Sequence, residues 1–111
     1  VCGVPLAERA FTLLSDKTLI RVEAADGTRV RRGETVLHLS GHARALLSAE
    51  RVALNFLQYL GGIATLTGRY VDAVQGTATR ILDTRKTLPG WRGLAKYAVA
   101  CGGGVNHRMD L

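Results

Sequence analysis

Four side chains that can bind anions lie at the ends of two short runs that are typical of strands, in the carboxyl-terminal part of this chain. Arg85 and Lys86 come directly after one run, and His107 and Arg108 end the other. Guanidinium and ammonium groups bind carboxylates and phosphates, and an imidazole also serves as an acid, a base or a hydrogen-bond donor. The alternative is that all four are solvated loop residues. The residue types favour an anion site, provided that the fold brings the two runs together.

The intervening segment has the pattern of a helix between two strands. Residues 80–84 and 105–108 are typical of strands, and residues 85–90 contain a Pro-Gly turn signal. The helical spacing comes from Trp91, Leu94, Ala95, Ala98 and Val99, and it ends at three glycines, 102–104. A strand–helix–strand unit has a right-handed crossover and parallel strands. The four anion-binding side chains are therefore expected at one carboxyl edge of the sheet.

The first forty residues predict a helix followed by a small antiparallel sheet. The helix is expected over residues 5–14, with Pro5 at its first position. Strands are expected over residues 19–24 and 36–39, with turn signals between them at Asp26-Gly27 and at Arg32-Gly33.

A long helix is predicted over residues 42–60, with a break at Gly61-Gly62 and a helical continuation over residues 65–74. Its apolar arc consists of Leu46, Ala49, Ala53, Leu54, Leu57 and Leu60. A second face, here called the polar ribbon, consists of Arg44, Ser48, Arg51, Asn55 and Gln58. The ribbon suits an interface or a ligand, and the alternative is an ordinary solvated face. Glu50 falls within the apolar arc, where a carboxylate is expected to need a partner.

Composition narrows the class of protein. The formal net charge is +6, but aromatic residues make up only 5%, which does not favour a nucleic-acid surface. No apolar run approaches the roughly 20 residues of a membrane span. Cys2 and Cys101 lack the spacing of a metal motif, so we expect two inert thiols, a reducing compartment and a cytoplasmic location. The only methionine is Met109, and both ends appear cut from a longer protein.

Four ordered segments resemble the quinolinate phosphoribosyltransferase family. They are AERVALNFLQ at residues 49–58, GIAT at 62–65, LDTRKT at 82–87 with Pro89-Gly90, and CGGGVNHR at 101–108. The resemblance is collinear over nearly the whole chain, and Gly61 is one departure, where the family often has serine. It implies an α+β amino-terminal domain over residues 1–62, leading into the first strands of an incomplete β/α barrel over residues 63–111.

The resemblance also implies an activity and a set of site residues. The expected reaction converts quinolinate and phosphoribosyl pyrophosphate to nicotinate mononucleotide, CO₂ and pyrophosphate, in a homodimer or higher homo-oligomer. Lys86 and His107 are the expected catalytic residues, and Arg51 is the residue expected to act across a subunit interface. The implied substrate-binding set is Arg51, Thr84, Arg85, Lys86, His107 and Arg108. Mg²⁺ is expected, with its ligands outside this chain, and the chain alone is expected to be inactive.

Three alternatives remain at this point. A paralogue of the same fold, the ModD type associated with molybdate-transport operons, differs in residues beyond Leu111. A biotinyl- or lipoyl-like carrier module is suggested by the two glycine turns, but no lysine lies between Lys17 and Lys86 to carry the group. A basic nucleic-acid-binding domain lacks its aromatic platform.

Overall fold

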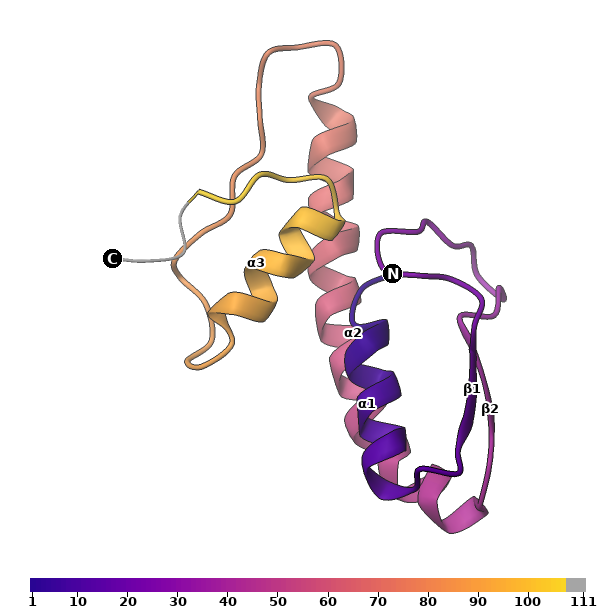
Figure 1. The fold of residues 1–111 in the computed structure, drawn as a ribbon. Coiled ribbons are helices and arrows are strands. Elements are labelled where there is room, and N and C mark those ends of the chain that lie inside the picture. The colour runs from indigo at the N-terminus through magenta and orange to yellow at the C-terminus, as the bar shows by residue number, and fades with distance from the viewer. Residues whose placement is uncertain (108–111) are drawn as a thin grey trace.

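One long helix forms the spine of the chain. The computed structural model describes residues 1–107, and it places the other elements along two stretches of this helix (Figure 1). The elements are α1 (Val4–Leu14), β1 (Leu19–Val22), β2 (Leu37–Ser40), α2 (Ala43–Ala73) and α3 (Arg92–Cys101). The first helix and the hairpin lie along the early turns of α2, and α3 crosses its middle. Among the described residues, no helix has both the length and the apolar character needed to cross a bilayer.

The amino-terminal part is the small α+β unit that the sequence predicts. β1 and β2 pair antiparallel, with Ile20 opposite Leu39. Their apolar side chains, together with Phe11 of α1, pack against the alanines Ala49 and Ala53 of α2. β1 ends at Val22 rather than at the predicted residue 24, because the N–H groups of residues 23 and 24 both donate to the carbonyl of residue 36, which ends the regular ladder.

The predicted helix break at Gly61-Gly62 is wrong, because α2 is continuous through both glycines. Each glycine costs a helix about 1 kcal/mol relative to alanine. Tertiary packing offsets that cost here, since Leu60 and Ala64 on either side are buried against α3 and the start of the chain. The predicted domain boundary at residues 62 and 63 therefore falls inside a helix, and the division into two domains stays a prediction.

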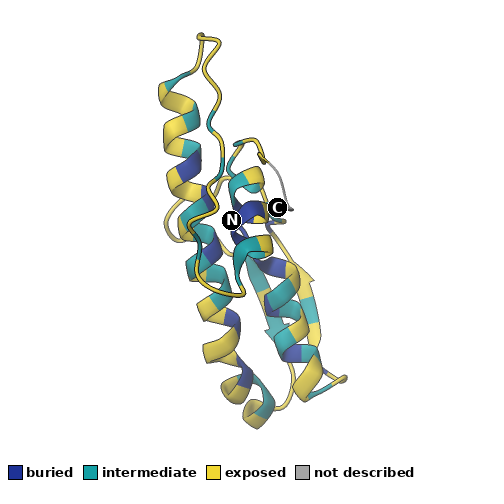
Figure 2. Cartoon of the chain, turned by 90° about the vertical axis from the view of Figure 1, so that its left-hand side faces the viewer, coloured by how far each residue is buried: buried dark blue, intermediate teal, exposed yellow. Residues whose placement is uncertain are grey.

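The faces of α2 agree in part with the predicted pattern. Figure 2 shows buried patches along the helix where it meets the other elements, and exposed surface over much of the remainder. Leu60, Ala49 and Ala53 of the apolar arc are buried. Glu50 was expected to need a partner, but its side chain is exposed and water solvates the carboxylate, so that expectation is wrong. Leu54 is also exposed, because the elements on α2 cover a narrower arc than the pattern suggests.

The strand–helix–strand unit is present in reduced form. Leu82 and Val105 form an isolated parallel bridge, which confirms the predicted direction and adjacency. The N–H of Val105 donates to the carbonyl of Ile81 at 2.8 Å, and the N–H of Asp83 donates to the carbonyl of Val105 at 3.2 Å. The full strands predicted over residues 80–84 and 105–108 do not form within the described residues. Parallel strands gain most of their stability inside larger, covered sheets, which a single pair lacks.

Glycine at position 102 allows α3 to approach α2 closely. A Cβ atom at Gly102 would lie 2.4 Å from the carbonyl oxygen of Ala64 and 2.7 Å from the Cβ of Thr67. Gly102→Ala is therefore expected to destabilise a full-length protein carrying this chain by about 1–3 kcal/mol, as overpacking does. Gly93→Ala is the matched control, since a Cβ there meets nothing within 4 Å. Denaturant unfolding measures both, and equal effects would contradict the close packing.

Candidate functional site

The parallel bridge between Leu82 and Val105 sets the edge at which the candidate site lies. Residues 83–86 continue from one bridge partner, and residues 106 and 107 continue from the other. The two segments therefore leave the bridge in the same direction, toward the carboxyl edge. This edge carries Thr84, Arg85, Lys86 and His107 of the predicted set. Arg108 belongs to the same prediction and lies outside the described residues.

The carboxylate of Asp83 joins the two segments. Its Oδ2 accepts a hydrogen bond from Nζ of Lys96 at 2.6 Å, and its Oδ1 accepts one from the backbone N–H of His107 at 3.0 Å. With its amide oriented to satisfy its neighbours, Asn106 donates to Oδ2 of Asp83 at 3.1 Å and to the carbonyl of Lys96 at 2.9 Å. Three segments, namely the first strand end, α3 and the second strand end, therefore meet at one side chain.

The ion pair between Asp83 and Lys96 is almost completely buried. The exposed fractions of the two side chains are 2% for Asp83 and 1% for Lys96. Burial alone raises the pKa of Asp83, but the hydrogen bonds from Lys96 and from the His107 backbone, and the charge of Lys96, outweigh burial and hold that pKa below its usual range. The carboxylate is therefore charged at neutral pH and able to fix both strand ends.

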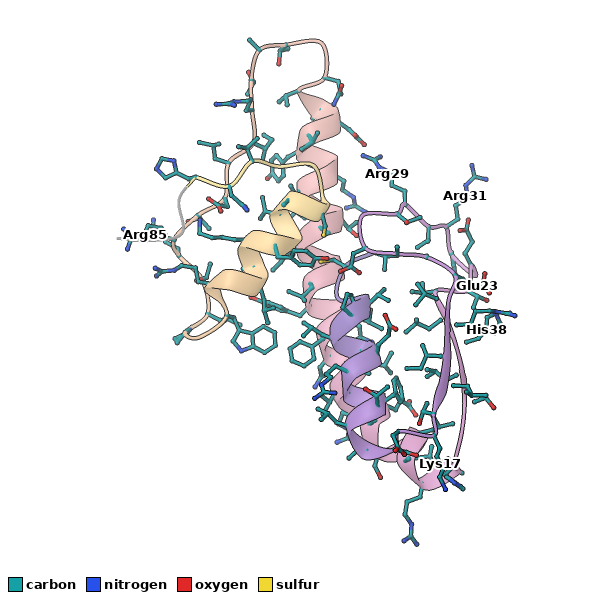
Figure 3. All side chains as sticks on the ribbon, in the orientation of Figure 1. Lys17, Glu23, Arg29, Arg31, His38 and Arg85 are labelled. Carbon is teal, nitrogen blue, oxygen red and sulfur yellow. The ribbon has the colours of Figure 1, made fainter. Side chains whose placement is uncertain are left out.

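The loop after the first strand is held by a local turn. The backbone N–H of Lys86 donates to Oγ1 of Thr84 at 3.1 Å, which is a typical use of a threonine hydroxyl in a turn. Thr84, Arg85 and Lys86 are all exposed. Figure 3 shows the side chain of Arg85 extending from the loop on the side of α3 that faces away from the hairpin. Within residues 1–107, the exposed Arg85 guanidinium is therefore placed to bind a ligand rather than packed in the core.

A groove of about 430 Å³ lies beside this loop. Thr84, Lys86 and Leu88 line one side of it, and Tyr59 and Ile63 of α2 line the other. The same tyrosine packs edge-on against the ring of Trp91, with the two ring centroids 5.1 Å apart. One wall of the groove therefore includes the ring of Tyr59 in α2, which is packed against Trp91 just before α3.

Arg51 does not join the other predicted site residues. It is exposed on α2, between Ala49 and Ala53, whose side chains are buried against α1 and the hairpin. Tyr59, at the groove, comes eight residues later, which corresponds to about 12 Å along a helix axis. All five residues of the polar ribbon are exposed. Within this chain, therefore, Arg51 belongs to a separate surface.

Sequence reasoning missed the residues that organise the site. Asp83 and Asn106 were noticed only as members of motifs, and Lys96 was not singled out. A signal was present in Lys96, because it lies in the middle of a helix whose only other charged residue, Arg92, is its first. An isolated lysine in such a place needs an acidic partner. Only the fold shows that the partner is Asp83, thirteen residues earlier in the chain.

The arrangement suits an anionic ligand with more than one charged group. An arginine, a lysine and a histidine stand exposed at one edge, and the carboxylate that residues 1–107 place between the two strand ends, that of Asp83, is neutralised by Lys96. Such an edge has a positive potential and fixed backbone geometry, which are the properties that carboxylate and phosphate recognition requires.

Comparison with known proteins identifies the family to which this edge belongs. Residues 1–61 match the model of the quinolinate phosphoribosyl transferase N-terminal domain, and residues 63–111 match that of the C-terminal domain. A nicotinate-nucleotide pyrophosphorylase (carboxylating) of Mycobacterium leprae is 49% identical over the whole of this chain, which spans 40% of that relative. The match places the chain in a different family from the biotinyl carriers and the nucleic-acid-binding domains.

Solved structures agree with this result in fold. The nicotinate-nucleotide pyrophosphorylase of Francisella tularensis is 42% identical, with a TM-score of 0.96 over 99% of this chain and 40% of its own. The corresponding protein of Ehrlichia chaffeensis is 40% identical, with a TM-score of 0.95 over 100% of this chain and 40% of its own. The chain thus spans about two fifths of the relatives that it matches. It belongs to the quinolinate phosphoribosyltransferase family, and it carries the helix and hairpin part together with the first strand–helix–strand unit.

Proposed function

We propose that this chain is the part of a quinolinate phosphoribosyltransferase that holds the carboxylates and phosphates of the substrates. The proposed overall reaction converts quinolinate and phosphoribosyl pyrophosphate to nicotinate mononucleotide, CO₂ and pyrophosphate. The observation that carries the proposal is the bonding of Asp83, at the first strand end, to Lys96 of α3 and to the backbone of His107 at the second, which brings Arg85, Lys86 and His107 to one edge. The names of the relatives, which include quinolinate phosphoribosyltransferase (decarboxylating) of Nicotiana glauca at 43% identity, support the choice of reaction.

The chemistry of the chain's own side chains fits these substrates. Quinolinate carries two carboxylates, and Arg85 offers a planar fork that matches one of them in a bidentate pair. Lys86 offers a point charge for a second carboxylate or for a phosphate. As the pyridine nitrogen attacks the anomeric carbon, pyrophosphate leaves with its charge, and the cationic edge stabilises it. The positively charged ring then takes up the electrons left by the carboxylate next to its nitrogen.

Mg²⁺ does not fit the described part of this edge. Hard divalent cations bind oxygen ligands, chiefly carboxylates. The carboxylate of Asp83 is buried and bonded to Lys96, and the other side chains of the predicted set are cationic, imidazole or hydroxyl groups. We therefore assign no Mg²⁺ ligand to the described residues of this edge. The Mg²⁺ expected from the family resemblance would be held by residues outside it.

A homo-oligomer is the proposed assembly, because Arg51 lies on an exposed ribbon away from the strand edge. An arginine there serves a second subunit more easily than its own. A cytoplasmic location is also proposed, and it is supported by the two free cysteines, Cys2 and Cys101, which suit a reducing compartment.

The test of the proposed reaction is the release of labelled CO₂. A full-length protein carrying this chain is given quinolinate labelled in the carboxylate next to the ring nitrogen. We expect release that depends on phosphoribosyl pyrophosphate and matches the nicotinate mononucleotide formed. Transfer to another acceptor without CO₂ would favour the ModD-type paralogue instead and would refute the proposal.

Subunit mixing tests the role of Arg51. In the full-length protein, Arg51→Ala and Arg108→Ala are each expected to be nearly inactive. A mixed oligomer is expected to recover part of the activity, because one hybrid site contains both arginines. Subunit exchange is monitored independently with tagged subunits. Exchange without any recovery of activity would show that Arg51 acts within its own subunit or only in folding.

A further inference from the structure

Two cysteines and one aspartate from distant parts of the sequence meet beside the start of α1. The sulfur atoms of Cys2 and Cys101 and a carboxylate oxygen of Asp26 all lie within 4.8 Å of one another. Cys2 precedes α1, Asp26 lies in the turn after β1, and Cys101 is the last residue of α3. Figure 1 shows the start of the chain entering α1 beside the carboxyl end of α3. The candidate reaction site at Asp83 does not include any of these groups.

The carboxylate of Asp26 is held in a fixed orientation. Its Oδ2 accepts hydrogen bonds from the N–H of Gly3 at 3.0 Å and from the hydroxyl of Tyr97 at 2.7 Å. Its Oδ1 accepts a hydrogen bond from the N–H of Val4 at 2.9 Å. A carboxylate oxygen can accept more than one bond, so Oδ1 keeps capacity for a further partner. Asp26 therefore acts as a fixed oxygen donor next to the two sulfurs.

The cluster is unfavourable for anions unless a cation is present. Cys2 is completely buried. Its burial, followed by the hydrogen bond and charge of Cys101 and the charge of Asp26, raises the pKa of the Cys2 thiol to about 12. The hydrogen bond to Asp26 and burial likewise raise the pKa of Tyr97. A divalent cation would reverse this balance, because it is attracted to the same groups that repel one another as anions.

We propose that Cys2, Asp26 and Cys101 form a binding site for a zinc-like divalent cation. Two sulfurs and one carboxylate oxygen are ligand types that Zn²⁺ takes in tetrahedral sites, and a water molecule or the Tyr97 oxygen completes four ligands. Each thiol that binds as a thiolate loses its proton to solvent as its sulfur–metal bond forms. The net change is one divalent cation bound and up to two protons released, with no oxidation or reduction.

The consequence of such a site is structural. It joins the start of α1 to the end of α3, and so connects the hairpin part of the chain to the strand–helix–strand unit. Gly102, Gly103 and Gly104 directly follow Cys101 and lead to the segment that carries His107. The site is separate from the proposed reaction, so the cobalt experiment tests it independently of that reaction. The wide separation of Cys2 and Cys101 in the sequence hides it from any spacing rule.

Cobalt binding tests the proposal. A full-length protein carrying this chain is stripped of metal, kept reduced with a phosphine and titrated with Co²⁺, whose thiolate charge-transfer and tetrahedral d–d bands report the ligands. We expect one equivalent to bind with both kinds of band, Zn²⁺ to displace it, and about one to two protons to leave per ion. Cys2→Ala and Cys101→Ala are each expected to weaken binding by at least about 100-fold.

Asp72→Asn is the matched control, because Asp72 is an exposed carboxylate that pairs with Arg29 and is not one of the three clustered groups, and affinity is expected to stay unchanged. Unfolding curves of the variants check that they remain folded. Bands that survive both cysteine variants would show adventitious binding and overturn the proposal. A reduced parent protein whose two thiols remain reactive and give no thiolate bands would overturn it as well.

Discussion

Asp83→Asn and Lys96→Met are each expected to destabilise a full-length protein carrying this chain by about 3–5 kcal/mol, because each leaves one buried partner without its counterpart. The two side chains are 2% and 1% exposed, so water does not replace the missing charge. The double variant Asp83→Asn with Lys96→Met is expected to recover most of the stability, since it buries no unpaired charge. Denaturant unfolding of the four proteins measures the coupling.

The same four proteins separate stability from positioning. Amide exchange at His107 is expected to rise in both variants that carry Asp83→Asn, because the amide loses its charged acceptor. Activity is therefore expected to stay low in the double variant despite its recovered stability. Full activity in a stable double variant would contradict the positioning role. Additive losses of stability would contradict the buried pair itself.

Acid should weaken this pair in a defined direction. The pKa of Asp83 is held below its usual range, so the pair's contribution is fully present above the ordinary carboxyl pKa of about 3.9. It is lost as the pH falls below that value and through the lowered pKa of the folded protein. The double variant is the reference for this loss, because it has no carboxylate to protonate at the position.

Variants of the cationic and imidazole side chains at the strand edge are expected to give the largest losses in catalysis. In the full-length protein, Arg85→Lys, Lys86→Ala and His107→Ala should each lower kcat/KM by roughly 30- to 1000-fold, equivalent to about 2–4 kcal/mol. Arg108→Lys, outside the described residues, belongs to the same prediction. For the two arginine variants the reason is geometric, since a lysine ammonium cannot reproduce the two-pronged contact of arginine with a carboxylate. The two alanine variants remove the binding group itself.

Arg32→Lys is the matched control for these variants, because Arg32 lies exposed in the turn between the two strands of the hairpin. Arg92→Lys is a less suitable control, because the Arg92 guanidinium lies 3.5 Å from the carbonyl oxygen of Arg85. Melting temperatures check folding. Small and equal losses at Arg32 and Arg85 would mean that bulk charge, not a pocket, attracts the substrates.

Local sequence patterns predicted where helices and strands occur, but long-range contacts determine where the helix α2 ends. The turn signals at Asp26-Gly27 and Arg32-Gly33 predicted the hairpin, and the helical spacing from Trp91 onward predicted α3, because turn residues and apolar spacing are both local properties of the chain. Gly61 and Gly62 misled the prediction of α2. Their helical cost is a local quantity, whereas the burial of Leu60 against α3 and the chain's start is not visible locally.

The same distinction applies to the site. The position of Arg85 and Lys86 after a strand predicted a cationic edge, since topology alone brings strand ends together. The ion pair of Asp83 with Lys96 was not predictable, because nothing in the sequence says which face of α3 turns toward the strand end. Arg51 is the opposite case. The family resemblance predicts that it acts across a subunit interface, and a single chain does not contain the second subunit that would test this role.

The most direct test is the structure of a full-length protein carrying this chain with quinolinate bound. We expect one carboxylate of quinolinate to lie about 2.7–2.9 Å from the guanidinium nitrogens of Arg85, the usual length of charge-assisted hydrogen bonds. We also expect the ligand to contact Lys86 and His107 of the same subunit and Arg51 of a neighbouring one. Quinolinate bound with both carboxylates away from Arg85, Lys86 and His107 would contradict the assigned site.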